Sequence, residues 1–283
     1  MGTFVTIALD DTYSSLIEPA FALLKNIDDA LSTFNKKSPI YRLNHNKSAK
    51  LNAYAYEALK LSLQYYKDTD GYFDIAIGRI TKDLYRFGLD ERVASTKSLQ
   101  QVSTALSELI FNKDEAIITD TIKIDLGGMG KGFGVDKVYG YFKQHGVKHA
   151  IIALSGDIRC IGKCPIAVND PLREGEVLAT FNIQNSGVST SGNYNRYVKD
   201  RTHNHLINPK KKSSETNFIS VTLIGKLPSA TLDAYATAVS VMPKPKAYEF
   251  LDAQNLAYII LESNKQLVLS KNLAEYVQDL KLK

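Results

Sequence analysis

The sequence predicts an α+β fold, in which strands and helices follow one another irregularly and do not alternate as in a doubly wound sheet. Two helical patterns come early in the chain, and strand-like segments separated by further helices fill the remainder. With 283 residues, 44% of them hydrophobic and 23% charged, the chain can bury a sizeable core. It contains no repeat, low-complexity tract or evident linker. We therefore predict one compact unit over residues 1–283, in one or two lobes, with mixed sheets and flanking helices.

The first quarter of the chain predicts one strand and two helices. Apolar residues alternate with others over Thr3–Leu9, which is the pattern of a strand with one buried side. Apolar residues then recur at helical spacing over Leu16–Phe34 and predict an amphipathic helix of about five turns. A second helix is predicted from about Ala53 to Lys67, and it should stop at the turn signal Asp70-Gly71.

The rest of the chain predicts more strands than helices. Short apolar runs indicate strands at Ala116–Asp125, His149–Leu154, Val177–Ile183, Ile219–Ile224 and Ala257–Leu261. Helical spacing indicates helices near Lys131–His145, Thr231–Met242 and Lys246–Asp252.

Composition excludes several classes of protein. The net charge of +5 is mild, and only Lys210, Lys211 and Lys212 run together, which we interpret as a solvated turn, so no nucleic-acid partner is expected. No stretch approaches the roughly 18 consecutive apolar residues of a membrane span. Cys160 and Cys164 have no histidine or further cysteine nearby, so we predict two packed thiols and no zinc site.

The most informative stretch is the glycine-rich segment Lys123–Asp136. A β-rich run ends at Asp125, five glycines follow within ten residues, and a helix is predicted to begin around Lys131. Glycines allow close approach of a ligand to the backbone, and the N–H groups at a helix start attract anions. The order of the glycines fits neither the Rossmann nor the P-loop pattern. Phosphate binding and a packing turn are therefore equally compatible with this segment.

A second stretch, Ser229–Thr237, carries a carboxylate and a hydroxyl at helical spacing. Asp233 and Thr237 are four residues apart and share one face of a helix. They could form part of an Mg²⁺ shell, because this ion prefers oxygen ligands. The alternative is that Asp233 caps the helix start, and the residues alone favour this cap.

Three short polar segments are each more typical of a turn than of a site. They are Asp70–Asp74, Leu154–Asp157 and Val188–Gly192. His205 stands before an apolar pair, where a histidine is more often structural than catalytic.

Taken in chain order, these segments resemble the FAD:protein FMN transferases, the ApbE family. Each motif is short, but nine of them in one order cover nearly the whole chain. They are Met1–Thr3, Ser38–Asn44, Thr69–Asp74 with Gly78, Leu84–Gly88, Ile124–Gly132 with Asp136, Ser155–Arg159, Ser189–Gly192, His205–Pro209 and Asp233–Thr237.

The resemblance implies a role for particular residues. Four of them would line the FAD site: Met1, Tyr41, Asp125 and Lys131. The carbonyl of Gly128 and the side chains of Asp233 and Thr237 would hold Mg²⁺, so the resemblance favours the metal ligand over the helix cap. His205 or Asp233 would accept a proton.

The implied reaction is Mg²⁺-dependent transfer of FMN from FAD onto a Thr or Ser hydroxyl of an acceptor protein, with release of AMP. Two alternatives stay open: an Mg²⁺-dependent FAD pyrophosphatase that gives FMN and AMP, and a non-catalytic FAD-binding protein. The family is commonly exported, so we expect a location in the cell envelope or periplasm. Since no signal peptide is visible, we expect membrane association only through a leader that the given chain lacks.

Three departures from the family pattern concern the surroundings of the site. Lys210–Ser214 replaces a small Thr-Gly pair, which leaves the choice of acceptor open. Tyr85-Arg86 replaces a Trp-Gly pair. Ser155 stands where glycine is commoner, and we predict a turn that needs no positive φ at this position.

Overall fold

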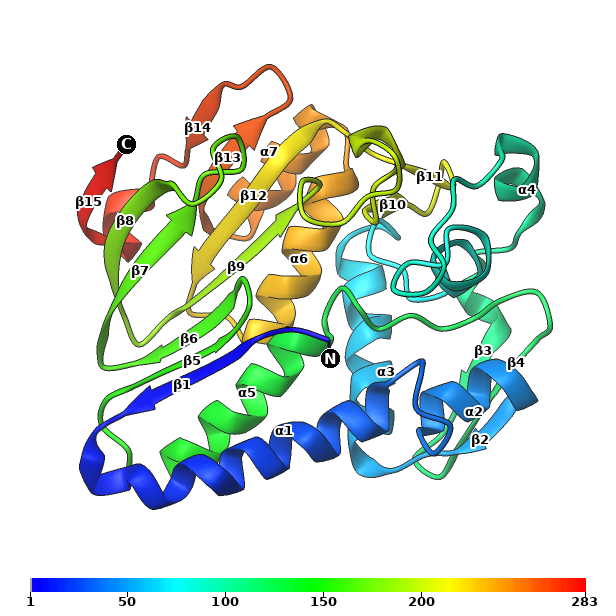
Figure 1. The fold of residues 1–283 in the computed structure, drawn as a ribbon, viewed down its shortest axis with the longest axis horizontal. Helices are drawn as coiled ribbons and strands as arrows, with labels where there is room; N and C mark the ends of the chain where they lie inside the picture. The colour runs from blue at the N-terminus through cyan, green and yellow to red at the C-terminus, as the bar shows by residue number, and fades with distance from the viewer. Residues whose placement is uncertain (1) are drawn as a thin grey trace.

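Seven strands form the central sheet of the computed structural model, which describes residues 2–283 (Figure 1). Every pair of neighbouring strands in this sheet is antiparallel. In spatial order the strands are β1 (Val5–Leu9), β5 (Ala150–Leu154), β6 (Asp157–Ile161), β9 (Gly187–Gly192), β12 (Phe218–Gly225), β13 (Ala257–Glu262) and β14 (Leu267–Leu269).

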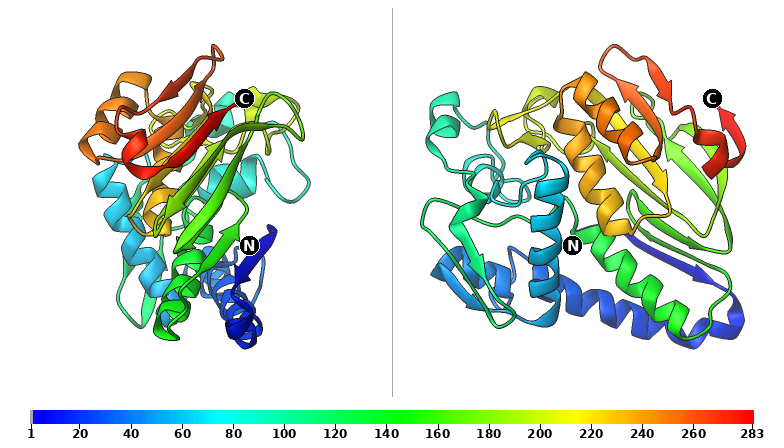
Figure 2. Two further views of the ribbon diagram at one scale, coloured as in Figure 1. Left: turned by 90° about the vertical axis from the view of Figure 1, so that its left-hand side faces the viewer. Right: turned by 180° about the vertical axis from the view of Figure 1, so that it is seen from behind.

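Helices cover one face of this sheet, as the view from behind shows (Figure 2). They are α1 (Ile17–Leu31), α5 (Gly130–Gln144), α6 (Ser229–Val241) and α7 (Lys244–Ala253). Helix α5 packs Val138 and Phe142 against the apolar side of β5. Helix α6 is almost entirely buried, because it lies between the sheet and the rest of the chain. Polar groups on α6 therefore need partners inside the protein.

A smaller sheet packs on the opposite face of the central sheet. Its antiparallel strands are β15 (Gln278–Leu282), β8 (Val177–Gln184) and β7 (Lys163–Asn169), and the short helix α8 (Leu273–Tyr276) lies beside them. Cys160 and Cys164 are buried in the core between the two sheets. They form a disulfide, so the prediction of two packed thiols was wrong. The spacing of the two cysteines did not indicate a disulfide, because the distance between their Cα atoms depends on how the chain turns from β6 into β7.

Most of the remaining elements lie together on the right of Figure 1. The main ones are α2 (Pro39–Asn46), α3 (Ala53–Asp68) and the antiparallel sheet of β2 (Ser48–Lys50), β4 (Glu115–Ile118) and β3 (Leu109–Phe111). The shorter ones are the π-helix η2 (Arg79–Leu84), α4 (Thr96–Gln101), η3 (Leu106–Glu108), η4 (Arg201–His203), β10 (Ile207–Asn208) and β11 (Ser213–Ser214). The short helix η1 (Asp11–Leu16) lies apart from them and joins β1 to α1. Asn52 caps the start of helix α3, because its side chain accepts a hydrogen bond from the amide of Ala55.

The predicted α+β class is confirmed, and most of the predicted helices and strands begin and end within a few residues of their predicted positions. Helix α2 and strands β6 and β7 were not predicted. One strand differs, because β4 ends at Ile118 and not at Asp125. Beyond it the chain runs extended and makes only an isolated bridge between Lys123 and Ile77. Val188–Gly192 was interpreted as a turn, but it is part of the central strand β9.

Within residues 2–283, no helix is long and apolar enough to cross a membrane.

Candidate active site

A cavity of about 240 Å³ opens where the glycine-rich turn, helix α6 and strand β9 meet. Six of the residues predicted for the site line it: Asp125, Gly128, Lys131, His205, Asp233 and Thr237. Tyr41 is not among the lining residues; it lies on α2, where its ring stacks on His45 with 3.8 Å between centroids. Met1 lies outside the described residues. The fold thus brings together groups that are up to 112 positions apart in the sequence (125 to 237).

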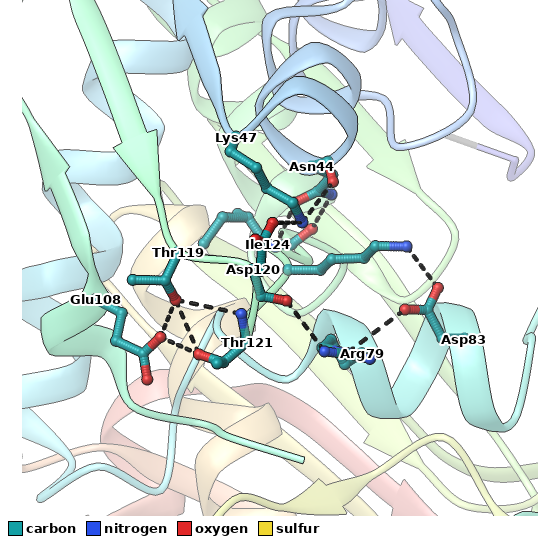
Figure 3. Close-up of polar contacts among 10 residues, drawn as sticks. Asn44, Lys47, Arg79, Asp83, Glu108, Thr119, Asp120, Thr121 and Ile124 are labelled. Carbon is teal, nitrogen blue, oxygen red and sulfur yellow. Dashed lines mark hydrogen bonds and ion pairs between the residues drawn. The ribbon is translucent and has the colours of Figure 1, made fainter.

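The chain that leads into the glycine turn is held by side chains from neighbouring elements (Figure 3). The side-chain amide of Asn44 donates to the carbonyl of Ile124 at 2.8 Å, and its oxygen accepts from the Ile124 N–H at 2.6 Å. Arg79 donates to the carbonyl of Asp120 at 3.0 Å. These bonds replace a strand neighbour and fix the position from which Asp125 enters the cavity.

Asp125 is held in one orientation by three groups. Thr81 donates its hydroxyl to Oδ2 at 2.6 Å, Lys82 Nζ lies 3.2 Å from the same oxygen, and the Gly127 N–H donates to Oδ1 at 3.0 Å. Burial alone would raise the pKa of Asp125, but Lys82 and these hydrogen bonds outweigh it and lower the pKa. Thr81 and Lys82 come from the π-helix η2, an element frequently found at functional sites.

Helices α5 and α6 touch at their N-terminal ends. A side chain at Gly132 would place its Cβ 2.2 Å from the carbonyl oxygen of Ser229, so only glycine permits this approach. Asp136 of α5 accepts hydrogen bonds from the first amides of α6, from Ser229 at 2.7 Å and Ala230 at 2.9 Å. Asp136 therefore caps α6, and Asp233 lies one turn inside the helix and is free of that role.

The close approach of the two helices brings Asp233 to the N-terminus of α5. Its Oδ2 accepts from the Gly132 N–H at 3.1 Å, and both of its oxygens lie 3.1 Å from Lys131 Nζ. Lys131 Nζ is also 2.9 Å from Oδ2 of Asp157, at the start of β6. One ammonium group thus serves two buried carboxylates.

The charges in this cluster shift the pKa values of Asp233 and Lys131. Burial and the neighbouring Asp157 raise the pKa of Asp233, and the Lys131 ammonium opposes them. For Lys131, burial works to lower the pKa, but the charges of Asp157 and Asp233 outweigh it and raise the pKa above its usual value. The lysine is therefore a permanent cation in the cavity.

Asp233, Thr237 and Gly128 line the cavity with oxygen atoms that could hold a hard cation. Thr237 lies one helical turn beyond Asp233, and its hydroxyl is 3.4 Å from the carbonyl oxygen of Gly128. A Cβ at residue 128 would lie 3.0 Å from the Thr237 methyl carbon. In the described part of the chain, no group of three or more His, Cys, Asp or Glu side chains gathers as a metal site. Any cation here would be bound by one carboxylate, one hydroxyl, one carbonyl and further ligands from water or substrate.

His205 contributes a neutral imidazole to the cavity wall. Its Nδ1 lies 3.1 Å from the carbonyl oxygen of Arg196, which can only accept, so Nδ1 carries the proton and Nε2 keeps a lone pair. Burial lowers the pKa of His205 to about 4. The ring packs edge to face on Phe87 at 6.5 Å between centroids.

Sequence reasoning did not assign two buried carboxylates to the site. Asp157 and Asp74 were each assigned to turns, yet both are buried, and Asp74 lines the cavity. Burial raises the pKa of Asp74 to about 7.

Ser155 has a φ of 56°, so the prediction of a turn without positive φ was wrong. The available signal for this positive φ was the position of Ser155. It is the first residue of the two-residue connection between β5 and β6, and such hairpin turns favour glycine there.

The family model of ApbE matches residues 1–260. The chain belongs to the ApbE family. Two curated relatives are named FAD:protein FMN transferase. The one from Haemophilus influenzae is 27% identical over 273 residues, covering 87% of this chain and 78% of the relative. The one from Escherichia coli K12 is 26% identical over 258 residues, covering 83% of this chain and 73% of the relative.

Two solved structures share the fold. The ApbE protein from Thermotoga maritima superposes with a TM-score of 0.88 at 24% identity, covering 98% of this chain and 97% of its own. The flavin transferase ApbE from Vibrio cholerae gives a TM-score of 0.81 at 21% identity, covering 98% and 96%. Nearly all of the described part of this family member therefore shares the fold of those proteins.

Proposed function

We propose that this ApbE-family chain transfers FMN from FAD onto a Thr or Ser hydroxyl of an acceptor protein and releases AMP. The observation that carries the proposal is the meeting of Lys131, Asp233 and the glycine turn in one cavity. The names of the curated relatives support FAD as the substrate and a protein as the acceptor.

The reaction is a displacement at the FMN-side phosphorus of the FAD pyrophosphate. The acceptor oxygen forms a new bond to this phosphorus, the bond to the bridging oxygen breaks, and AMP leaves with that oxygen. The transition state carries negative charge on the phosphoryl oxygens, and catalysis depends on positioning and charge neutralisation. Lys131 supplies one positive charge at the turn, and the glycines allow the pyrophosphate to approach the backbone.

The oxygen set of Asp233, Thr237 and the Gly128 carbonyl fits Mg²⁺. This ion prefers oxygen ligands and binds through one or two carboxylates together with water and substrate phosphates. Asp233 already faces a cationic group, Lys131 Nζ, which indicates that its position favours positive charge. When bound, Mg²⁺ would supply additional charge to stabilise the pyrophosphate oxygens.

His205 is the residue that we assign to accept the proton of the acceptor hydroxyl. The hydrogen bond to Arg196 fixes its tautomer and leaves Nε2 available. Asp233 is the alternative acceptor, but its oxygens are already held by Lys131 and Gly132. Asp125 completes the proposed FAD site inside the cavity. Tyr41, which lies outside the lining, and Met1, which lies outside the described residues, stay predictions for the same site.

The decisive experiment incubates the protein with FAD and Mg²⁺, with and without an acceptor that carries a flavinylation motif. A fluorescent acceptor band on a denaturing gel together with AMP supports transfer. AMP without labelled acceptor would support the pyrophosphatase alternative, and retained FAD without AMP would support a non-catalytic binding protein. The Asp233→Ala variant is expected to lose turnover, and full turnover by it would refute the metal assignment.

We also propose that the chain works in the cell envelope or periplasm. The buried Cys160–Cys164 disulfide supports this location, since disulfides persist in oxidising compartments and are rare in the cytosol. Alkylation and mass spectrometry on fractionated cells would test it. Recovery of reduced cysteines from the cytosolic fraction alone would contradict the proposal.

A further inference from the structure

Asp157 is a buried carboxylate next to the proposed metal ligands, and the proposed mechanism gives it no role. It begins strand β6 and is 1% exposed. Its register partner on β9 is Ser189, whose hydroxyl donates to Oδ1 at 2.6 Å. Its Oδ2 has one partner among the described residues, the Lys131 ammonium, whose Nζ lies 2.9 Å away.

Lys131 divides its charge between Asp157 and Asp233. Its Nζ lies 2.9 Å from the former carboxylate and 3.1 Å from the latter. A divalent cation at Asp233 would compete with the ammonium for the same oxygens, because the two cations repel each other. The ammonium would then have to leave Asp233, and an unpaired charge in a buried site is strongly destabilising.

We propose that Asp157 is a positioning residue that retains Lys131 in the cavity when Asp233 binds the metal ion. In this proposal Asp157 does not ligate the metal. The hydroxyl of Ser189 holds the Asp157 carboxylate on the strand side of Lys131. An ammonium group has three donors, so Lys131 could keep one on Asp157 and turn the others toward phosphate oxygens. This inference rests on the proposed function, because it assumes a cation at Asp233.

The charges of the cluster agree with this role. Two carboxylates and one ammonium leave one net negative charge in a buried region, which attracts a divalent cation. Without Asp157 the cluster would be neutral, and the cation would displace Lys131 into a position without a partner. Partners behind the ligands of a metal site commonly change metal affinity 10–100-fold when they are removed.

The test is a calorimetric titration of the full chain with MgCl₂ in the absence of FAD. We expect Asp157→Asn to raise the Kd for Mg²⁺ by about 10-fold or more. The matched control is Asp170→Asn, which removes the charge of another buried carboxylate, paired with Arg173 at 2.9 Å outside the cavity. The control should leave the Kd unchanged. Asp157→Glu, which keeps the charge, should recover part of the affinity.

A second measurement reports on Lys131 itself. With Mg²⁺ at saturation, limited acetylation and mass spectrometry give the reactivity of Lys131 relative to the exposed Lys113. We expect this ratio to rise several-fold in Asp157→Asn, since the ammonium has lost its remaining partner. Should that variant fail to fold, Ser189→Ala keeps the carboxylate but removes the hydroxyl that orients it, and a smaller rise in both Kd and reactivity is expected.

The outcomes separate the inference from the proposed function. A wild-type protein that binds no Mg²⁺ would overturn the metal site on which both depend. The role of Asp157 alone would be overturned if the wild-type protein binds Mg²⁺ and both the Kd and the Lys131 reactivity are unchanged in Asp157→Asn and Ser189→Ala. Equal losses of affinity in Asp157→Asn and Asp170→Asn would indicate a general loss of stability and would also overturn it.

Discussion

The His205 imidazole is neutral because burial lowers its pKa to about 4. A general base must be unprotonated, so the proposed role of His205 should persist to lower pH than an ordinary histidine allows. We expect the ring resonances of His205 in an NMR titration to show no change near pH 6.5. A ring titration with a midpoint near pH 6.5 would contradict the neutral state that we assign.

Replacing the ring tests the same residue. In His205→Asn the side-chain amide can still donate to the Arg196 carbonyl, but the Nε2 lone pair is lost, and we expect the rate to fall by about 10²–10⁴-fold. His149→Asn is the control, since His149 lies at the surface beside Asp10 and should retain the full rate. Activity would be followed as AMP release under saturating FAD.

Asp74 links burial to stability. Burial raises its pKa to about 7, above the ordinary 3.8, so the folded protein binds this proton more tightly than the unfolded chain does. Stability from this group is therefore present below about pH 4 and is lost as pH rises from about 4 to about 7. We expect Asp74→Asn to raise the Tm by several degrees at pH 8 and to leave it nearly unchanged at pH 4. Thermal melts at both pH values would decide, and an equal shift at each would exclude the titration.

At the scale of elements, the site depends on how closely α5 approaches α6. Gly132→Ala would place a methyl group 2.2 Å from the Ser229 carbonyl oxygen and push the helices apart. We expect a loss of stability of about 1–3 kcal/mol, together with weaker turnover, because Lys131 and Asp233 would separate. Thermal melts and AMP release measure the two effects.

Helix α5 offers a matched control for that substitution. A Cβ at Gly140 would meet no atom within 4 Å, so Gly140→Ala should stabilise the protein by about 0.5–1 kcal/mol and keep its activity. If both alanine variants behaved alike, the contact at Gly132 would not be what holds the site together.

The positions of helices and strands could be predicted where the periodic pattern of apolar residues was long. The helix predicted from Ala53 to Lys67 is α3, because apolar residues recur over four turns there. Strand β9 was missed, since its hydroxyl-rich residues are typical of a turn and gain their burial only from the strands on either side. The cap of α6 was also misplaced, because Asp136 comes from another helix.

At the scale of the whole molecule, the candidate site could be predicted only in part. The glycine turn and the Asp233–Thr237 pair were visible as local motifs. The contact between Lys131 and Asp157 was not, because it joins a helix start to a strand start and leaves no local pattern. Their burial depends on the packing of α5 and α6 against the sheet, and one sequence alone does not reveal it.

The disulfide lies on the far side of the central sheet from the helices that carry Lys131 and Asp233. It closes a loop of only a few residues, so removing it in a Cys160→Ala, Cys164→Ala double variant should cost about 2 kcal/mol. We expect urea unfolding to show this loss, whereas AMP release in the absence of urea stays at the wild-type rate. A variant with unchanged stability but lost activity would show that the two sheets are coupled to the site.

Asn44 closes a ring of two hydrogen bonds with Ile124, a residue 80 positions away. The Asn44 side chain thus makes the two hydrogen bonds that a neighbouring strand would otherwise make. The Ile124 amide proton is therefore protected from exchange with solvent by the packing of helix α2 and not by a sheet. Its hydrogen exchange would report how often α2 lifts away from the segment before the glycine turn. An amide that exchanges faster in Asn44→Ala, with the Ile152 amide in β5 unchanged, would make Ile124 a local sensor of the geometry that presents Asp125.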